Sequence, residues 1–304
     1  LNDSATNETR GQALSLYMIV QTLGIVVSQA SINLADPAGW NLFVAMSVLV
    51  SISFAPILLT VSPAPPFAAT KRMTMRELFD ASPLGMMGAF LLGFVFAAMF
   101  GMGAVYGTEA GLGVGQISLL VAAFYVGGLL FQFPVGVISD RMDRRRLILF
   151  LTAGSFGATM LAWPFLDLFP VVLLLAGLIG GVANPLYALM IAHTADHLEP
   201  EDMAAASSGL LFVNGVGAVA GPFLVGGMMA LVGPDGYFLF LGLLLGLIAA
   251  YTGYRMTRRA AVPVEESASF APVMPQATPV AMEIATELAI EDLEENAARA
   301  DDPA

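Results

Sequence analysis

The chain has 304 residues, of which 57% are hydrophobic and only 12% are charged, and it contains no cysteine. A water-soluble domain is about 45–50% apolar and about 25% charged, so this composition argues against a soluble globule and favours a membrane protein. Without cysteine, the chain has no disulfide, no thiol nucleophile and no thiolate metal ligand. The net charge of −12 comes mostly from the residues after about 262, so it indicates no charged partner for the rest.

Apolar runs of the length of a membrane span recur along most of the chain. About 20 helical residues cross about 30 Å of hydrocarbon, which makes such a run the natural unit of this sequence. We predict an all-α membrane protein, a polytopic helical bundle with about eight spans. The predicted spans cover residues 11–34, 40–62, 83–107, 115–139, 146–165, 169–193, 204–232 and 236–256.

Composition shifts divide the chain into four predicted parts. Residues 1–62 carry the first two helices, and residues 63–82 form a polar, proline-containing cytoplasmic linker. Its end, near Met73 to Asp80, is expected to form a short amphipathic helix. Residues 83–256 carry the other six helices, and residues 257–304 form an acidic tail with several prolines. Because of that composition, we predict that the tail is disordered.

Every loop that contains Lys or Arg falls on the same predicted side of the membrane, and one loop on that side contains neither. The loops near Asp36, Glu109, Asp167 and Asp235 contain no Lys or Arg. Because basic loops stay in the cytoplasm, we predict a multi-pass protein of the cell inner membrane with both termini cytoplasmic. The exception is the loop from His193 to Asp202, which should be cytoplasmic yet has no Lys or Arg. The basic positions are Arg10, Lys71, Arg72, Arg76, Arg141, Arg144, Arg145, Arg146, Arg255, Arg258 and Arg259.

The turn between the fourth and fifth spans is the most charged segment of the apolar region. It begins at Gly136, continues with Asp140 and Arg141, and ends in the basic run Arg144-Arg145-Arg146. This order, Gly-x-x-x-Asp-Arg followed by basic residues, resembles the loop motif of the major facilitator superfamily. Asp143 stands where that family usually has glycine, a residue that tolerates unusual backbone dihedrals. Asp can also adopt such dihedrals, and its charge can pair with a neighbouring arginine.

Two further segments extend the resemblance toward the bacterial YcaD-like branch of the family. One is Asn2 to Leu14, in which Asn7 to Gly11 leads into the first span. The other combines Ala192 to Asp196, Ala206 to Leu211 and Gly215 to Pro222. The resemblance covers residues 1–256 and implies the major facilitator fold, with about eight of twelve transmembrane helices present. On that mapping the first four helices are missing, so we expect an N-terminally truncated chain.

The resemblance implies a secondary transporter that moves a small organic solute by alternating access. Its expected partners are the lipid bilayer and a small-molecule substrate, with no nucleic acid and no cofactor, and the chain is expected to be a monomer and not an enzyme. Two alternatives stay open at this point. One is a transporter-like membrane sensor or scaffold that signals through the acidic tail, and the other is an inactive fragment of a carrier.

In the family this loop docks on the cytoplasmic start of the fifth helix, which corresponds to Arg10 and Gly11 here. The resemblance therefore predicts a contact of Asp140 with Arg10 or with that helix start, which closes the cytoplasmic side in one state. The alternative is that the arginines only keep the loop in the cytoplasm. The predicted gating residues are Gly136, Asp140, Arg141, Arg144, Arg145, Arg146 and Arg10.

Polar side chains inside the spans are candidates for the substrate path, because polar groups are costly to bury in a membrane. Gln21, Tyr125, Asn184 and Asn214 lie at about mid-depth, although hydrogen bonds between helices would explain them equally well. No span has an Asp, Glu, Lys or Arg at mid-depth, so proton coupling stays open.

Two other patterns have a functional and a structural interpretation. Gly217, Gly221 and Pro222 in the seventh span allow either close helix packing or bending. His193 and His197 are four residues apart on one helix face, a spacing that suits zinc. They lie at a helix end without an HExxH motif, so we predict no metal site.

Overall fold

The computed structural model describes residues 7–36, 38–59, 73–199, 202–259, 262–263 and 270, and within them the regular structure is entirely helical. The predicted all-α polytopic fold is confirmed. One helix contains a π-helical segment, η3, between α4 and α5. The elements are α1 Asn7–Ser31, η2 Ile32–Leu34, α2 Asn41–Leu59, α3 Met75–Ala81, α4 Pro83–Phe96, η3 Ala97–Met102, α5 Gly103–Glu109, α6 Val114–Ser139, α7 Arg144–Ala162, η4 Trp163–Phe165, α8 Phe169–Ala195, α9 Met203–Val232 and α10 Gly236–Met256.

Six of the described helices are long and apolar enough to cross a membrane. They are the continuous helix Pro83–Glu109, then α6, Arg144–Phe165, α8, α9 and α10. Their ends lie within about two residues of the last six predicted spans, because long apolar runs are a strong local signal. The first two predicted spans coincide with α1 and α2, whose apolar described stretches, Ile19–Leu34 and Asn41–Pro56, are shorter.

The predicted linker ends in two helix starts that its own residues cap. The Thr74 hydroxyl accepts a hydrogen bond from Glu77 N–H, and the Glu77 carboxylate accepts one from Thr74 N–H at 2.7 Å. This reciprocal capping begins α3, which confirms the short helix predicted near Met73 to Asp80. Ser82 caps α4, where Pro83 occupies the first helical position and needs no amide partner. Residues 63–72 of the linker lie outside the described part of the chain.

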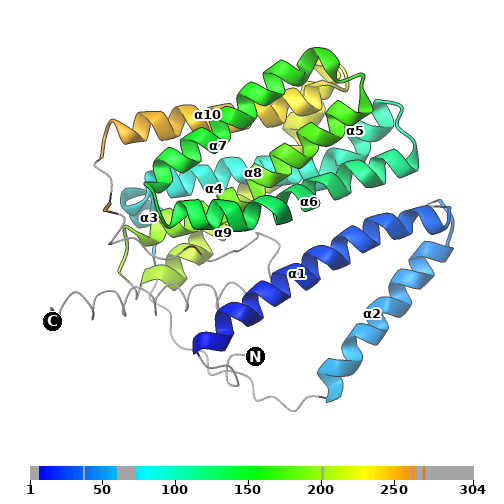
Figure 1. The fold of residues 1–304 in the computed structure, drawn as a ribbon, viewed down its shortest axis with the longest axis horizontal. Coiled ribbons are helices and arrows are strands. Elements are labelled where there is room, and N and C mark those ends of the chain that lie inside the picture. The colour runs from blue at the N-terminus through cyan, green and yellow to red at the C-terminus, as the bar shows by residue number, and fades with distance from the viewer. Residues whose placement is uncertain are drawn as a thin grey trace.

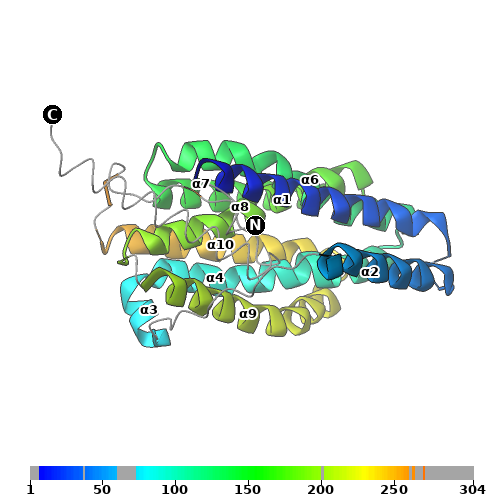
Figure 2. The same cartoon turned by 90° about the horizontal axis from the view of Figure 1, so that it is seen from below.

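Three helix pairs form the bundle, and glycines bring each pair close together (Figures 1 and 2). In α6 and α8, the Cα of Gly180 lies against the backbone of Phe124. In α7 and α10, Gly242 faces the side chain of Thr159. The third pair is α4 and α9. Small residues allow this approach, and close packing is a main source of helix association in membranes.

The α4–α9 pair contains the glycines that the sequence singled out. Gly217 lies against the carbonyl oxygen of Phe90, and Gly221 lies against Ala97. These contacts give both glycines a packing role. Pro222 lies inside α9, which continues as a helix on both sides of it. A bending role for Pro222 stays a prediction.

The first two helices relate to the bundle in different ways. α1 and η2 pack along α6, whereas α2 lies apart from the six long helices (Figure 1). Large apolar side chains of α2 are exposed in the described structure, including Phe43 at 60%, Leu49 at 67% and Leu58 at 82%. An apolar helix surface of this extent is stable only against lipid or other helices. The division of the chain into four parts stays a prediction.

Candidate functional site

The charged loop between α6 and α7 is a tight turn of four residues. α6 ends at Ser139, and the Asp140 N–H donates to the Gly136 carbonyl at 3.1 Å. α7 begins at Arg144, and the Asp143 carboxylate accepts a hydrogen bond from Arg145 N–H at 2.9 Å. Asp143 is therefore the N-cap of α7, a position at which an aspartate side chain satisfies an unpaired backbone donor.

Asp143 explains how the turn forms without the glycine that is usual in the family. Its φ is −52°, and no described non-glycine residue has a positive φ, so the turn uses no left-handed backbone here. The turn therefore forms without the unusual dihedral that a glycine at this position would permit. The Asp143 carboxylate also pairs with the Arg145 guanidinium, with oxygen–nitrogen distances of 3.1 and 3.2 Å. The predicted pairing with a neighbouring arginine is confirmed.

Arg144 anchors the start of α7 to the end of α8. Its side chain is only 3% exposed and forms an ion pair with Asp196, whose side chain is 5% exposed. The same guanidinium donates to the Ser139 hydroxyl at 3.3 Å and to the Ala192 carbonyl at 3.2 Å. A buried ion pair needs such additional hydrogen bonds to offset the cost of desolvation. The pair therefore holds the loop rigidly against α8.

Arg145 makes a second anchor, toward the end of α10. It is 8% exposed, and it donates to the Arg259 carbonyl at 2.8 Å. The Arg259 guanidinium in turn donates to the Ala81 carbonyl at the end of α3, at 2.9 Å. Together the two buried arginines connect the loop with α3, α8 and α10. The other two arginines of the loop, Arg141 and Arg146, are exposed.

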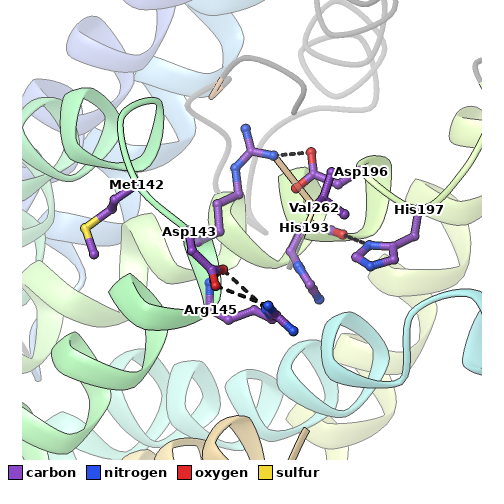
Figure 3. A pocket seen from close by; sticks show the side chains of 8 residues that line it. Met142, Asp143, Arg145, His193, Asp196, His197 and Val262 are labelled. Atoms are coloured by element: carbon purple, nitrogen blue, oxygen red, sulfur yellow. Dashed lines mark hydrogen bonds and ion pairs between the residues drawn. The ribbon is translucent and has the colours of Figure 1, made fainter. Parts of the chain in front are cut away.

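The histidine pair lies beside these arginines (Figure 3). His193 is buried, and a ring nitrogen of His197, Nδ1, lies 2.8 Å from the His193 carbonyl oxygen. The pKa of His197 is lowered, because burial and the nearby Arg259 and Arg145 disfavour its charged form more than the His193 carbonyl and Asp196 favour it. His197 is therefore neutral at neutral pH, and the positive charge here comes from arginine.

Asp140 lies at the outer, exposed side of the same loop. Its carboxylate accepts a hydrogen bond from the backbone N–H of Phe270 at 2.9 Å. The Phe270 ring lies against Gly136, where a Cβ atom would come within 2.8 Å of it. Arg10 belongs to α1, which packs along α6, but its side chain lies outside the described residues. The Asp140–Arg10 contact therefore stays a prediction.

The four substrate-path candidates lie at different helix interfaces. Asn184 donates to the Gly180 carbonyl in its own helix at 2.8 Å and to the Phe124 carbonyl of α6 at 3.4 Å. Asn214 of α9 donates to a carbonyl of α4, that of Ala89, at 2.9 Å. These bonds give both asparagines a packing role. Gln21 is half-buried in α1. Binding of substrate by any of them stays a prediction.

Tyr125 belongs to a row of aromatic rings that sequence reasoning did not assemble. Its ring stacks on Phe100 of η3, with centroids 4.5 Å apart. Phe100 stacks on Phe96 at 6.0 Å, and Phe96 meets the ring of Tyr187 edge-on at 6.3 Å. The row surrounds the π-helical segment, a type of local widening that is frequent at functional sites. The sequence carries no periodic signal for such a segment.

Several buried polar atoms of α6 and α8 have no hydrogen-bond partner within the described residues. They are the Tyr187 hydroxyl, the Asn184 carbonyl oxygen and both amide atoms of Gln132. A buried polar group without a partner is costly, so such atoms commonly meet water or a ligand. Gln132 and Tyr187 thus join the four predicted positions as candidates for a polar path between α6 and α8.

Comparison with known proteins identifies the family. Residues 86–288 match the sequence profile of the Major Facilitator Superfamily. Over 254 residues the chain is 25% identical to the uncharacterised MFS-type transporter YfkF of Bacillus subtilis, covering 80% of this chain and 64% of YfkF. Over 228 residues it is 25% identical to the MFS-type transporter YcaD of Escherichia coli, covering 72% of this chain and 57% of YcaD. No solved structure matches the chain.

These similarities agree with the architecture described above. The matched region extends over well over half of the chain and includes the loop from Gly136 to Arg146. The chain spans less than two thirds of the length of the two curated relatives. Both relatives are MFS-type transporters, which points to membrane transport rather than to enzyme catalysis. The chain is thus a multi-pass membrane protein that belongs to the Major Facilitator Superfamily.

Proposed function

We propose that this protein is a secondary transporter that moves a small organic solute by alternating access. The observation that carries the proposal is that the charged residues of this loop differ in burial. Arg144 and Arg145 are buried and bind α8 and α10, whereas Asp140 is exposed at the end of α6. A rigidly held loop with an exposed carboxylate suits a contact that forms and breaks when two units move as rigid bodies.

The proposed moving contact is between Asp140 and the start of α1. α1 packs along α6, the helix that ends next to Asp140. A carboxylate at a helix N-terminus is stabilised by unpaired N–H groups and by the helix dipole, by about 0.3–1 kcal/mol. A contact of this strength can be exchanged during a transport cycle. The anchored arginines would make the loop move together with the six-helix unit when the contact opens.

In the proposed orientation the protein lies in the inner membrane of the cell, and the α6–α7 loop lies on the cytoplasmic side. The described basic residues of the six long helices lie at one end, in the α6–α7 loop and at the end of α10. The turns at the opposite end contain Glu109, Asp167 and Asp235 and no Lys or Arg. Lys and Arg in short loops are retained in the cytoplasm, which supports this orientation.

The proposed substrate path follows the aromatic row and the partnerless polar atoms between α6 and α8. Tyr125, Tyr187 and Gln132 offer ring faces, a hydroxyl and an amide, a set that suits a small organic solute. No predicted span carries a charged residue at mid-depth, so any ion coupling would use other groups.

Thiol accessibility tests alternating access directly, because the chain contains no cysteine. A single cysteine in place of the half-buried Tyr125 would be labelled with a membrane-impermeant maleimide added to one side or the other of oriented vesicles. Alternating access predicts labelling from both sides. Asp140→Asn should then raise labelling from the side of the loop, because it weakens the closing contact.

The matched control is Arg258→Gln, since Arg258 is an exposed arginine at the same end of the bundle, after α10, and lies outside the predicted gating residues. It should leave the labelling ratio unchanged. Labelling from one side only, in both the unsubstituted background and Asp140→Asn, would contradict alternating access. Uptake of candidate solutes by the same vesicles would then identify the substrate.

A further inference from the structure

A small positively charged cavity lies next to the loop, between the starts of α4 and α7 and the ends of α8 and α10. The empty space within its lining is about 270 Å³, which includes its opening to solvent. A second cavity of about 300 Å³ (Figure 3) shares three of the lining residues, Arg145, His193 and His197. The titratable side chains that line the first cavity are those of Arg145, Arg255, Arg259, His193 and His197.

His193 is the most buried titratable group of this cavity, and its ring meets the His197 ring edge-on at 4.8 Å. It is only 7% exposed, and its ring makes no hydrogen bond within the described part of the chain. Figure 3 shows that its ring and the Arg145 guanidinium approach each other. The ring nitrogens of His193 have no hydrogen-bond partner among the described residues, and His193 lines the cavity, so they can bind a polar group that enters it.

The arginines of the cavity differ in how their charge is balanced. Arg145 pairs with Asp143, and the neighbouring Asp196 pairs with Arg144. Arg255 has no hydrogen-bond or ion-pair partner in the described residues, and Arg259 donates only to a neutral carbonyl. Two positive charges therefore line the cavity without a described carboxylate to balance them. Their mutual repulsion falls when an anion binds between them.

The start of α4 adds to this positive potential. Ser82 is its N-cap, and Ser82, Pro83 and Leu84 line the cavity. Pro83 has no N–H and the Gly85 N–H donates to the Ser82 hydroxyl, so this contribution comes from the helix dipole and the Leu84 N–H. Arginine is well suited to phosphate, because its planar fork donates two parallel hydrogen bonds.

We propose that this cavity binds a phosphate group, with one oxygen near His193 and the others held by Arg255 and Arg259, which line the same cavity. The phosphate can belong to the headgroup of an anionic phospholipid or to a free anion. Helix ends of a membrane bundle lie at the headgroup level, where basic pockets between helices bind anionic headgroups. A bound phosphate would connect α10 with α4 and α8 at the anchored end of the loop, whether or not the chain transports a solute.

The first test is native mass spectrometry of the purified full chain offered equal amounts of phosphatidylglycerol and phosphatidylcholine. The measured quantity is the ratio of bound phosphatidylglycerol to bound phosphatidylcholine. This ratio should fall about fivefold in Arg255→Gln. It should fall about fivefold again in the double variant Arg255→Gln/Arg259→Gln. The matched control is Arg258→Gln. Arg258 is exposed and lies over the Tyr254 ring at 5.3 Å, outside the cavity, so the control should keep the ratio of the unsubstituted chain.

The second arm uses inorganic phosphate and reads the thermal unfolding midpoint of the same proteins in detergent. If the unsubstituted chain prefers phosphatidylglycerol but phosphate does not raise its unfolding midpoint, the site belongs to a lipid headgroup. If phosphate raises the midpoint but the chain shows no lipid preference, the site belongs to a free anion. The proposal is overturned when neither arm separates the unsubstituted chain from the arginine variants, or when Arg258→Gln loses as much as they do. Arg255→Gln alone decides the outcome if the double variant does not fold, because it removes no described hydrogen bond.

Discussion

The two sides of the α6–α7 loop have nearly the same residue types and opposite surroundings. On the α7 side, Asp143 caps the helix, and Arg144 and Arg145 are buried in contacts with α8 and α10. On the α6 side, Asp140 and Arg141 are exposed. The difference teaches that the charged motif has two functions. One side builds the end of the bundle, and the other remains available for contacts that change.

The largest expected effect comes from breaking the buried side at Arg144. Arg144→Met leaves the Asp196 carboxylate buried without its arginine, and a broken buried pair costs about 3–5 kcal/mol of stability. Thermal or denaturant unfolding in detergent measures this loss. Arg146→Gln is the matched control, because Arg146 is exposed in the same run and should change stability by less than about 0.5 kcal/mol. Equal losses in the two variants would show that burial does not distinguish these arginines.

A similar contrast between neighbours exists in α9, with an intermediate effect. Gly217→Ala would place a Cβ atom on the Phe90 carbonyl of α4, so we expect a loss of about 1–3 kcal/mol from overpacking. Gly215→Ala, two residues earlier, meets no atom within 4 Å and should not destabilise the protein. Unfolding in detergent checks both. A loss in Gly215→Ala as large as in Gly217→Ala would contradict the described α4–α9 packing.

A smaller effect is expected from the cap of α7. Asp143→Ala removes the hydrogen bond to Arg145 N–H, which costs about 0.5–2 kcal/mol. Asp143→Asn keeps the capping group but loses the charge that pairs with Arg145, and should retain most of the stability. Asp143→Gly should lower the free energy of unfolding by only a few tenths of a kcal/mol relative to the unsubstituted chain. If Asp143→Asn is as unstable as Asp143→Ala, the ion pair and not the cap is the main contribution.

Much of the fold was predictable because membrane spans are a local property of the sequence. The runs that became α6, α8, α9 and α10 were predicted nearly to their ends, since a bilayer selects long apolar segments irrespective of their neighbours. The start of α3 was also predictable, because the reciprocal cap of Thr74 and Glu77 joins residues three positions apart.

The site was less predictable, because its contacts join residues that are distant in the sequence. Arg144 and Asp196 are 52 positions apart, and Arg145 and the Arg259 carbonyl are 114 positions apart. The sequence placed Asp196 beside two histidines, for which we predicted no metal site, but no local pattern indicates which arginine Asp196 meets. The aromatic row from Phe96 to Tyr187 depends in the same way on how α4, α6 and α8 cross.

The sequence by itself determined the class of the protein, the position of its spans and the charged motif that marks its family. Hydrophobicity and motif order are properties of adjacent residues, and they need no knowledge of packing. Only the tertiary structure decided which charges of the motif are buried and which are exposed. That division follows from where the ends of α8 and α10 meet the start of α7, because a guanidinium leaves water only where other helices supply its hydrogen-bond partners.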